Sequence, residues 1–221
     1  MIISTERGSG LQICSLERVD STQRYLLDAL KSKKLNAPVA VVASVQHGGK
    51  GSRGNSWEGL EGNLFFSFAL PRTSLPDDLK LESASIYFTY LLTELLREMG
   101  SQIWLKWPND LYVGEKKAGG AITNLQNDIL VCGIGLNLIS APEGFGTLDI
   151  ETERNLLLEN YFEKLEKKIS WKQIFSKFKL EFDKSRVYKT HVDGLHVSLQ
   201  DAMLLQDGSL ECNGQRIFSL R

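Results

Sequence analysis

The sequence predicts an α+β protein, in which a mixed β-sheet carries helices and is followed by a small β unit. Apolar, β-branched runs alternate with segments of helical periodicity up to about residue 187. After about Tyr188, short apolar stretches are separated by Asp-Gly and Asn-Gly dipeptides, which are typical of hairpin turns. We therefore expect a main domain over residues 1–187 and a small β domain over residues 188–221.

The expected strands are short runs in which apolar and β-branched residues dominate. VAVVASV at residues 39–45 is almost wholly apolar, so we expect a buried strand. ILVCGIGLNL at residues 129–138 is expected to be a central strand that contains glycines. A glycine-rich loop is expected over residues 47–62. The full set of expected strands comprises residues 11–16, 39–45, 64–70, 103–105, 111–113, 117–123 and 129–138.

Four helices are expected from capping residues and helical spacing. Asp20-Ser21-Thr22 supplies capping side chains for the first helix, and the second is predicted over residues 79–99. Two more helices follow a loop with Pro142, and the last begins at Ser170, whose spacing to Gln173 indicates a capping box. The apolar faces are Tyr25, Leu26, Leu27 and Leu30 in the first, Ala84, Phe88, Leu91, Leu95 and Met99 in the second, and Trp171, Ile174, Phe175, Phe178 and Phe182 in the last.

Composition and charge argue against several classes of protein. Hydrophobic residues make up 42% of the 221 residues, enough to bury a core, so disorder is not expected. With Lys+Arg at 26 and Asp+Glu at 27, the net charge of −1 argues against a generally basic nucleic-acid binder. No apolar run predicts a membrane span, and the N-terminus lacks a secretory pattern. Cys14, Cys132 and Cys212 are far apart in apolar surroundings, so we expect reduced, buried thiols, no metal site and a cytoplasmic location.

Four segments that follow or enter strands could hold polar groups against a ligand. They are QHGGKGSRGNSW at 46–57, KWPNDL at 106–111, KKAGGA at 116–121 and GIGLNL at 133–138. Each also has a structural explanation when taken alone: a surface loop, a Pro-Asn-Asp turn, two solvated lysines on a hairpin, and a backbone clamp. For single segments both explanations stay open.

The first segment contains glycines spaced as GxGxxG between residues 49 and 54. A dinucleotide site needs a helix to begin there, but residues 55–62 are poor helix formers. A P-loop also fails, because Gly51 stands where Ser or Thr is required. What remains is a glycine backbone that can approach an anion closely, with positive charge from Lys50 and Arg53.

Two other segments place polar groups in unusual positions. Lys116 and Lys117 enter a strand just before a glycine pair, and glycine inside a strand often marks the close approach of a ligand. Asn137 lies in a run otherwise suited to the core. Burying an amide without partners costs about 1–3 kcal/mol, so we expect Asn137 to bond another group.

The order of the segments is more informative than any one of them. A DST turn at 20–22 before a helix, a Gln46…GxGxxGxxW loop, KWPNDL, a Lys-x-x-Gly strand from Lys117 and GxGxN follow one another over about residues 12–140. In this order they resemble the biotin protein ligase family. Residues 216–221 are also similar to the end of that family's small C-terminal β-barrel. The resemblance implies a mixed-sheet catalytic domain, like that of class II synthetases, and a small C-terminal barrel-like unit.

The resemblance implies a ligase that acts in two steps. The biotin carboxylate attacks the α-phosphate of ATP to give biotinyl-5′-AMP and pyrophosphate. A lysine of the biotin carboxyl carrier protein of acetyl-CoA carboxylase then attacks the mixed anhydride. Such an enzyme must neutralise two anions and hold them in line, and it needs no nucleophilic side chain. The implied cofactors are ATP and Mg²⁺, and the implied protein is a monomer or homodimer. From the chain itself we also expect that it binds neither DNA nor membrane.

The family pattern also implies roles for individual residues. Lys117 is expected to lie between the biotin carboxylate and the α-phosphate as the main charge stabiliser, and Asp110 to accept the proton of the attacking amine. Asn109 and Asp110 are expected to face the phosphates, the Mg²⁺ or the incoming lysine. The implied catalytic set is Lys117, Asp110 and Arg53. Biotin contacts are implied for Ser21, Thr22, Gln23, Gln46, Lys50, Gly51, Ser52 and Lys117. ATP contacts are implied for Lys50, Arg53, Trp57, Asn109, Lys117 and Asn137.

The chain departs from the family pattern in its glycine loop and at both ends. The family loop usually contains GRGRxG, whereas residues 49–54 are GKGSRG. Ser52 replaces the arginine that the family associates with retention of the adenylate, so either Arg53 substitutes for it or biotinyl-AMP is released more readily. We expect substitution by Arg53. About ten residues precede the first expected strand, which leaves no room for a helix-turn-helix domain, and the C-terminal unit is shorter than usual.

Two other functions remain as alternatives. A lipoate or octanoate ligase or transferase of the same fold would be expected to show an RRxxGGG-like loop, which is absent. A module that only binds biotin or nucleotide would not require both Lys117 and the KWPND segment. The ligase is therefore the function that the sequence favours.

If Arg53 retains the adenylate, the variant Arg53→Ala should release more biotinyl-AMP and label lysines nonspecifically. One charge-assisted hydrogen bond contributes about 1.5–3 kcal/mol, so release should rise about ten- to a hundredfold. Free biotinyl-AMP in solution is the quantity to measure. Unchanged release would show that Arg53 does not take over the role of the missing arginine.

Overall fold

The structure is dominated by one large mixed sheet. The computed structural model describes residues 2–8, 11–51, 56–192 and 195–218. The strands of the large sheet are β1 (Ile2–Gly8), β2 (Leu11–Val19), β3 (Val39–Lys50), β4 (Ser56–Gly59), β5 (Leu64–Pro71), β6 (Trp104–Lys106), β7 (Asp110–Val113), β8 (Lys116–Gln126) and β9 (Ile129–Leu136). Their order is β1-β2-β3-β5-β9-β8-β7-β6, with β4 paired to β3 beside this path. β2 and β3 run parallel, and the other neighbouring pairs run antiparallel.

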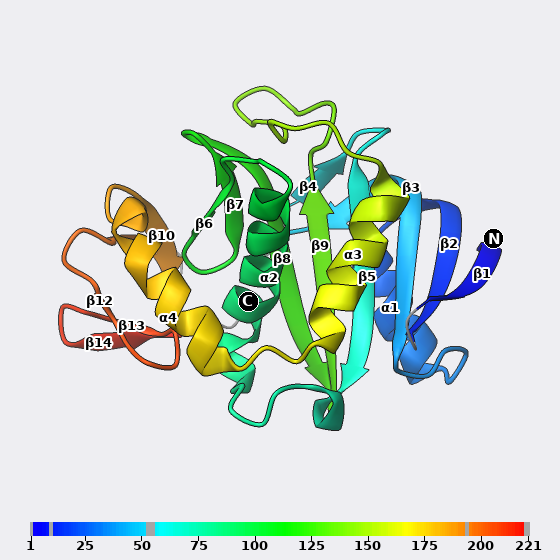
Figure 1. The fold of residues 1–221 in the computed structure, drawn as a ribbon, viewed down its shortest axis with the longest axis horizontal. Coiled ribbons are helices and arrows are strands. Elements are labelled where there is room, and N and C mark those ends of the chain that lie inside the picture. The colour runs from blue at the N-terminus through cyan, green and yellow to red at the C-terminus, as the bar shows by residue number, and fades with distance from the viewer. Residues whose placement is uncertain (1, 9–10, 52–55, 193–194, 219–221) are drawn as a thin grey trace.

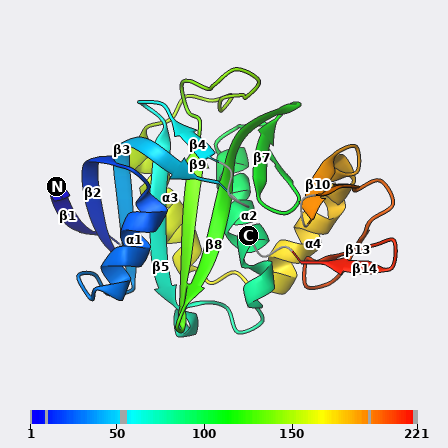
Figure 2. The same ribbon diagram turned by 180° about the vertical axis from the view of Figure 1, so that it is seen from behind.

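Helices cover both faces of this sheet (Figures 1 and 2). They are α1 (Thr22–Lys31), α2 (Ala84–Glu98), α3 (Arg154–Glu166) and α4 (Trp171–Glu181). α1 lies on one face against β3, β5 and β9, while α2 and α3 pack against each other on the opposite face. α4 packs against α2 towards one end of the molecule. The predicted α+β fold with a mixed sheet is therefore confirmed.

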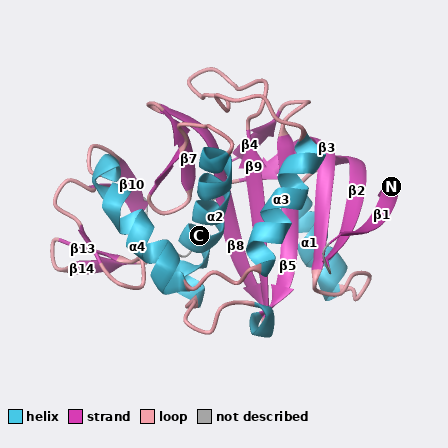
Figure 3. Ribbon diagram, in the orientation of Figure 1, coloured by secondary structure: helices cyan, strands magenta, loops and turns pink. Residues whose placement is uncertain are grey.

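The residues after α4 form two small sheets at that same end of the molecule (Figure 3). Their strands are β10 (Lys189–Val192) and β11 (Leu195–Ser198) in one sheet, and β12 (Met203–Leu204), β13 (Leu210–Cys212) and β14 (Gln215–Ile217) in the other. Asn213 and Gly214 join β13 to β14 with φ values of 51° and 73°, the backbone that a two-residue hairpin requires. Leu210 and Ile217 belong to the core beneath α2, so the small sheets pack on the main body. A domain boundary at residue 187 stays a prediction.

Alternation along the strands directs neighbouring side chains to opposite faces of the sheet. In β5, Phe66 and Phe68 face α3, where their rings meet those of Tyr161 and Phe162 at centroid distances of 5.5 to 5.9 Å. Ser67, between them, faces α1 instead and donates a hydrogen bond to Thr22. The same strand therefore fills the main core on one face and leaves a small polar residue on the other.

Three expectations about the strands and helices are wrong. No strand was expected before the one at residues 11–16, but β1 pairs with β2. The glycine-rich segment is a hairpin rather than a loop, since β3 continues to Lys50 and β4 pairs with it. Its glycines allow the two strands to approach, because a Cβ on Gly49 would lie 2.4 Å from the Trp57 backbone oxygen. The second helix begins at Ala84 rather than residue 79, because a 3₁₀ turn precedes it.

Other local predictions are confirmed. Ser21 caps α1 by accepting a hydrogen bond from the Arg24 backbone N–H, and Ser170 forms the predicted capping box with Gln173 at the start of α4. The three cysteines are buried and form no disulfide. In the described segments, no helix is both long and apolar enough to cross a membrane.

Truncation of Phe68 should weaken the fold strongly. The ring is fully buried and packs edge-on against Phe88 at 5.0 Å, as well as against α3, so Phe68→Ala leaves a cavity. We expect the free energy of unfolding in urea to fall by about 3–5 kcal/mol. Leu180→Ala, at a side chain that is 84% exposed, should change it by less than about 0.5 kcal/mol. Equal effects of the two substitutions would contradict the assignment of the core.

Candidate active site

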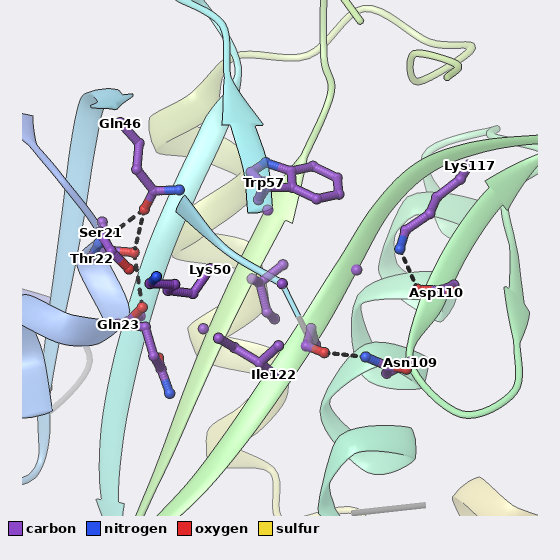
Figure 4. A pocket seen from close by; sticks show the side chains of 17 residues that line it. Ser21, Thr22, Gln23, Gln46, Lys50, Trp57, Asn109, Asp110, Lys117 and Ile122 are labelled. Carbon is purple, nitrogen blue, oxygen red and sulfur yellow. Dashed lines mark hydrogen bonds and ion pairs between the residues drawn. The ribbon is translucent and has the colours of Figure 1, made fainter. Parts of the chain in front are cut away.

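A pocket opens on the face of the sheet that carries α1, above β5, β8 and β9 (Figure 4). Glycines form part of its floor. In β9, Ile134 and Leu136 point to the main core, while Gly133 and Gly135 lie on the pocket side and add no side chain. The lining residues are Ser21, Thr22, Gln23, Gln46, Lys50, Gly51, Trp57, Ser67, Asn109, Asp110, Lys117, Gly120, Ala121, Ile122, Gly133, Ile134 and Gly135.

Hydrogen bonds hold the polar groups at the α1 end of the pocket. The Ser67 hydroxyl donates to Thr22 Oγ1 over 2.9 Å, and Thr22 Oγ1 lies 3.2 Å from Gln46 Oε1. The Thr22 backbone N–H donates to the same Gln46 oxygen over 2.9 Å. The side chains of α1, β3 and β5 are therefore fixed relative to one another before a ligand arrives.

Gln23 adds an acceptor atom to this end of the pocket. Its Nε2 donates to Asn124 Oδ1 over 3.0 Å and lies 3.4 Å from the Val131 oxygen. Its Oε1 is buried and has no hydrogen-bond partner among the described residues. That oxygen lies over the glycine floor, because a Cβ on Gly133 would come within 2.6 Å of it. Buried polar atoms are almost always bonded, so this oxygen favours a ligand that donates an N–H or O–H group.

The opposite end of the pocket is charged. The Asp110 carboxylate lies between two ammonium groups, with Lys117 Nζ 2.5 Å from Oδ1 and Lys106 Nζ 3.2 Å from Oδ2. Burial alone would raise the pKa of Asp110, but the two lysines and their hydrogen bonds outweigh burial and hold its pKa below the ordinary value. The carboxylate is therefore ionised at neutral pH.

The turn that carries Asp110 is tied to the rest of the molecule. Asn109 is buried and its Nδ2 donates to the Ala121 oxygen over 2.5 Å, across to β8. The Trp107 indole N–H donates to the Gly208 oxygen over 2.7 Å, and its backbone N–H donates to Ser185 Oγ. Residues from three distant parts of the chain thus fix the segment that sequence alone presents as an ordinary turn.

A second pocket adjoins the first. Its lining residues are Gly51, Ser56, Trp57, Glu58, Lys117, Asn137, Pro142 and Phe145. Gly51, Trp57 and Lys117 line both pockets, so Lys117 lies at the boundary between them. Its ammonium is 5.8 Å from the centroid of the Trp57 ring, which in turn meets the Phe145 ring edge-on at 6.5 Å.

Asn137 is one of the predicted residues on the wall of the second pocket. It is only 1% exposed, and its Nδ2 donates to the Gly146 oxygen over 3.0 Å, so the expected partner exists. Its Oδ1 is buried without a hydrogen-bond partner in the described part of the chain. The second pocket therefore also offers an unfilled acceptor, beside two aromatic rings.

The structure brings nearly all of the predicted site residues together, although they are divided between the two pockets. The first pocket alone contains Ser21, Thr22, Gln23, Gln46, Lys50, Asn109 and Asp110; both pockets contain Gly51, Trp57 and Lys117; the second alone contains Asn137. The predicted ATP contacts Lys50 and Asn109 thus line the first pocket rather than the second. The assignments to Ser52 and Arg53 lie outside the described residues.

Sequence reasoning gave no individual role to four residues that shape the site, although three of them lie in its candidate segments at 106–111 and 133–138. Ser67 is the lone hydroxyl in the apolar run LFFSFAL, which was the available signal. Gly133 and Gly135 are spaced by two in a strand, which places both on one face. Lys106 opens the KWPNDL segment, but nothing local indicates that its ammonium reaches Asp110.

The two pockets suit the joining of two anions. Lys117 lies where a ligand in the first pocket would meet one in the second, and Lys50 adds a further cation to the first. No histidine or cysteine is among the described residues that line either pocket. Within the described chain, no group of three His, Cys, Asp or Glu side chains could hold a metal ion. The lining residues offer positioning and charge stabilisation, and the Asp110 carboxylate is a candidate proton acceptor.

The chain is similar to several known proteins. The family model described as the biotin/lipoate A/B protein ligase family matches residues 15–137. The bifunctional ligase/repressor BirA of Escherichia coli (strain K12) is 31% identical over 136 residues, which cover 58% of this chain and 41% of BirA. The chain therefore matches less than half of the length of that protein.

Two solved structures are similar over almost the whole chain. The biotin acetyl coenzyme A carboxylase synthetase of Helicobacter pylori, with bound biotinylated ATP, is 42% identical, with a TM-score of 0.89, and the match covers 93% of this chain and 98% of that one. The biotin protein ligase of Aquifex aeolicus, in complex with biotin and ATP, is 26% identical, with a TM-score of 0.66 and coverage of 95% and 99%. Both similarities extend beyond the sheet into the C-terminal part.

The Asp110 ion pairs should stabilise the protein in a pH-dependent way. Because the folded pKa is lowered, their contribution is complete above the unfolded pKa of about 3.9 and is lost as pH falls through the folded value. Asp110→Asn should therefore lower the free energy of unfolding at pH 7 by about 3 kcal/mol, since it leaves two partly buried ammonium groups without a counter-charge. Urea unfolding from pH 7 to pH 3 should show this difference shrinking below about pH 4. A difference that grows as pH falls would contradict the prediction.

Proposed function

Because the chain belongs to the biotin/lipoate A/B protein ligase family, we propose that it is a biotin protein ligase. It activates biotin with ATP to biotinyl-5′-AMP and transfers biotin to a lysine of a biotin carboxyl carrier protein. The observation that carries this proposal is the position of Lys117, which lines both of two adjoining pockets. A carboxylate in the first pocket and an α-phosphate in the second would meet at its ammonium group.

The first pocket suits the two ends of biotin. Its inner end offers the unpartnered Gln23 Oε1 as an acceptor, together with the side-chain amide of Gln46 and the hydroxyls of Ser21 and Thr22, and these groups match the N–H and C=O groups of a ureido ring. The floor of Gly133 and Gly135 leaves space for the rest of the molecule. The carboxylate of the acyl chain would then reach Lys117 at the charged end.

The same inner end favours biotin over lipoate or octanoate, the acids used by the alternative function. Neither a dithiolane ring nor an alkyl chain has an N–H group, so each would leave the buried Gln23 Oε1 without a partner. An unsatisfied buried acceptor costs about 1–3 kcal/mol, or about ten- to a hundredfold in affinity. Sites built to bond a polar group reject analogues that lack it.

The second pocket suits the nucleotide. Trp57 and Phe145 offer aromatic surface to a base, and Asn137 Oδ1 can accept a hydrogen bond from an amino group. ATP is proposed to enter as its magnesium complex, because Mg²⁺ is commonly held by substrate phosphates and water with few protein carboxylates. The metal is thus part of the substrate and is not a resident of the protein.

The two steps require charge stabilisation and one proton acceptor. A biotin carboxylate oxygen attacks the α-phosphorus while the bond to pyrophosphate breaks, and Lys117 offsets the negative charge of both groups. In the second step the carrier lysine nitrogen attacks the anhydride carbonyl, AMP leaves with the bonding pair, and the amine loses a proton. Asp110 is proposed to accept that proton, since its carboxylate lies in the first pocket beside Lys117.

The proposed partner is the carrier protein of acetyl-CoA carboxylase, and the proposed location is the cytoplasm. Support for the partner comes from the family alone. Support for the location comes from Cys14, Cys132 and Cys212, which are buried and in no disulfide, as expected in a reducing compartment.

Incubation with biotin, MgATP and a biotin carrier domain should add one biotin to the carrier and release pyrophosphate. Lys117→Ala should lower kcat/KM about a hundredfold or more, because it removes the cation at the meeting point of two anions. Lys116→Ala is the matched control, since Lys116 is the preceding, exposed lysine of the same strand and lines neither pocket. The carrier's mass and pyrophosphate release are the two readouts.

The same assay separates the alternatives. Pyrophosphate release without a change in carrier mass would retain the adenylation step and reject the proposed acceptor. Transfer of octanoyl or lipoyl groups, with no biotin-dependent turnover, would assign the chain to the sister activity. Equal loss in the Lys116 and Lys117 variants would contradict the specific role given to Lys117.

A further inference from the structure

Lys106 is a buried lysine that the proposed reaction does not use. Its side chain is 11% exposed, and its ammonium lies 3.2 Å from Asp110 Oδ2. The ammonium is also 5.6 Å from the ring centroids of both Tyr112 and Tyr188. Removing an ammonium group from water is costly, so its retention beside the reaction centre calls for a compensating role.

The aromatic rings around Lys106 are fixed by the rest of the fold. Trp104, Tyr112 and Tyr188 contact one another at centroid distances of 5.2 to 5.7 Å. The Trp104 indole N–H donates to the Gly114 backbone oxygen over 2.9 Å. The backbone oxygen of Tyr188 accepts a hydrogen bond from the backbone N–H of Leu199. Two rings therefore flank the ammonium, and one of them comes from the segment that leads into the C-terminal sheets.

Asp110 has two cationic partners with different surroundings. Lys117 lines both pockets, so its ammonium is the one that incoming carboxylate and phosphate groups can attract away. Lys106 lines neither pocket and is held between rings, so we expect it to remain on Asp110 Oδ2 when substrates bind. Cation–π contacts add to this restraint, and they are stronger where the cation is shielded from water.

We propose that Lys106 is a positioning residue, which holds the Asp110 carboxylate ionised and correctly oriented for the transfer step while Lys117 engages the substrates. Lys106 acts through Asp110 and does not touch either substrate. This inference rests on the proposed ligase function and deepens it. It also gives the C-terminal segment a part in the reaction, because Tyr188 holds Lys106 in place.

Electrostatics around Asp110 agree with this role. The titratable groups that interact with it are Lys106 from β6, Lys117 from β8 and Tyr112 on its own strand, and Lys50 of β3 lines the same pocket. Burial, together with the charge of Asp110, raises the pKa of Tyr112, so this phenol stays neutral and offers a ring face rather than a second anion. Loss of Lys106 would leave burial opposed by one cation fewer, and the pKa of Asp110 would rise.

The test compares Lys106→Met with Lys106→Arg, using Lys179→Met as a matched control at an exposed lysine of α4. In the biotin, MgATP and carrier assay, Lys106→Met should lower kcat for carrier labelling about 10- to 100-fold. KM for biotin and ATP should remain close to the wild-type values, because both pockets are intact. Lys106→Arg keeps the charge and should recover most of the turnover, and Lys179→Met should behave as wild type.

The pH profile of kcat separates a positioning role from a general structural one. If Asp110 must be ionised, the acid limb should move to higher pH in Lys106→Met and stay near the wild-type position in Lys106→Arg. Thermal unfolding and biotin binding check that each variant is folded. If Lys106→Met does not fold, Tyr188→Leu, which removes one flanking ring, should give the same shift and a smaller fall in kcat.

Each result has a distinct meaning. An unchanged kcat and acid limb in folded Lys106→Met, with an active wild type, would overturn this inference and leave the ligase function in place. A loss of kcat with a parallel rise in both KM values and no rescue by arginine would also overturn it, in favour of a structural role. A wild type with no biotin-dependent labelling would reject the ligase function, and this inference with it.

Discussion

The central strand β9 has to meet opposite requirements on its two faces, and both the fold and the site depend on this. One face presents Leu130, Cys132, Ile134 and Leu136 to the core beneath α2 and α3. The other face carries glycine where the pocket needs an open floor. Since side chains alternate strictly along a strand, no other arrangement places a full core and an empty floor on the same backbone. The neighbouring strand β5 repeats this division, with Phe66 and Phe68 in the main core and Ser67 on the pocket side.

The distribution of charged side chains in the first pocket matters as much as its shape. The first pocket has neutral hydrogen-bonding groups at the α1 end and an ion-pair network at the other, so one elongated acid can be recognised at both of its ends. Asp110 would be costly to bury alone, and the two lysines would repel each other without it. The three groups are therefore stable only as a set, and the set places an ammonium group at the boundary between the two pockets.

The C-terminal part of the chain supports this arrangement from behind. The backbone oxygen of Gly208 accepts a hydrogen bond from the Trp107 indole N–H. The backbone oxygen of Asp207 accepts one from the hydroxyl of Ser83, at the start of α2. The ring of Tyr188 flanks the Lys106 ammonium. A segment that contributes no lining residue to either pocket among those described is thus attached to the turn that carries Asn109 and Asp110. Its packing on the main core explains how it can influence the site without contacting a ligand.

The sequence by itself determined the alternation of strands and helices, the cap of α1 at Ser21, and many of the residues that line the two pockets, because these depend on local pattern and on the order of short motifs. It did not determine that the glycine-rich segment is a hairpin, since glycine favours loops and close strand pairing equally until a partner such as Trp57 is in place. Nor did it determine the two-pocket division, the role of Ser67 or the contact of Lys106 with Asp110. Only the tertiary structure decided these, because they depend on which strands become neighbours and on which side chains burial brings together.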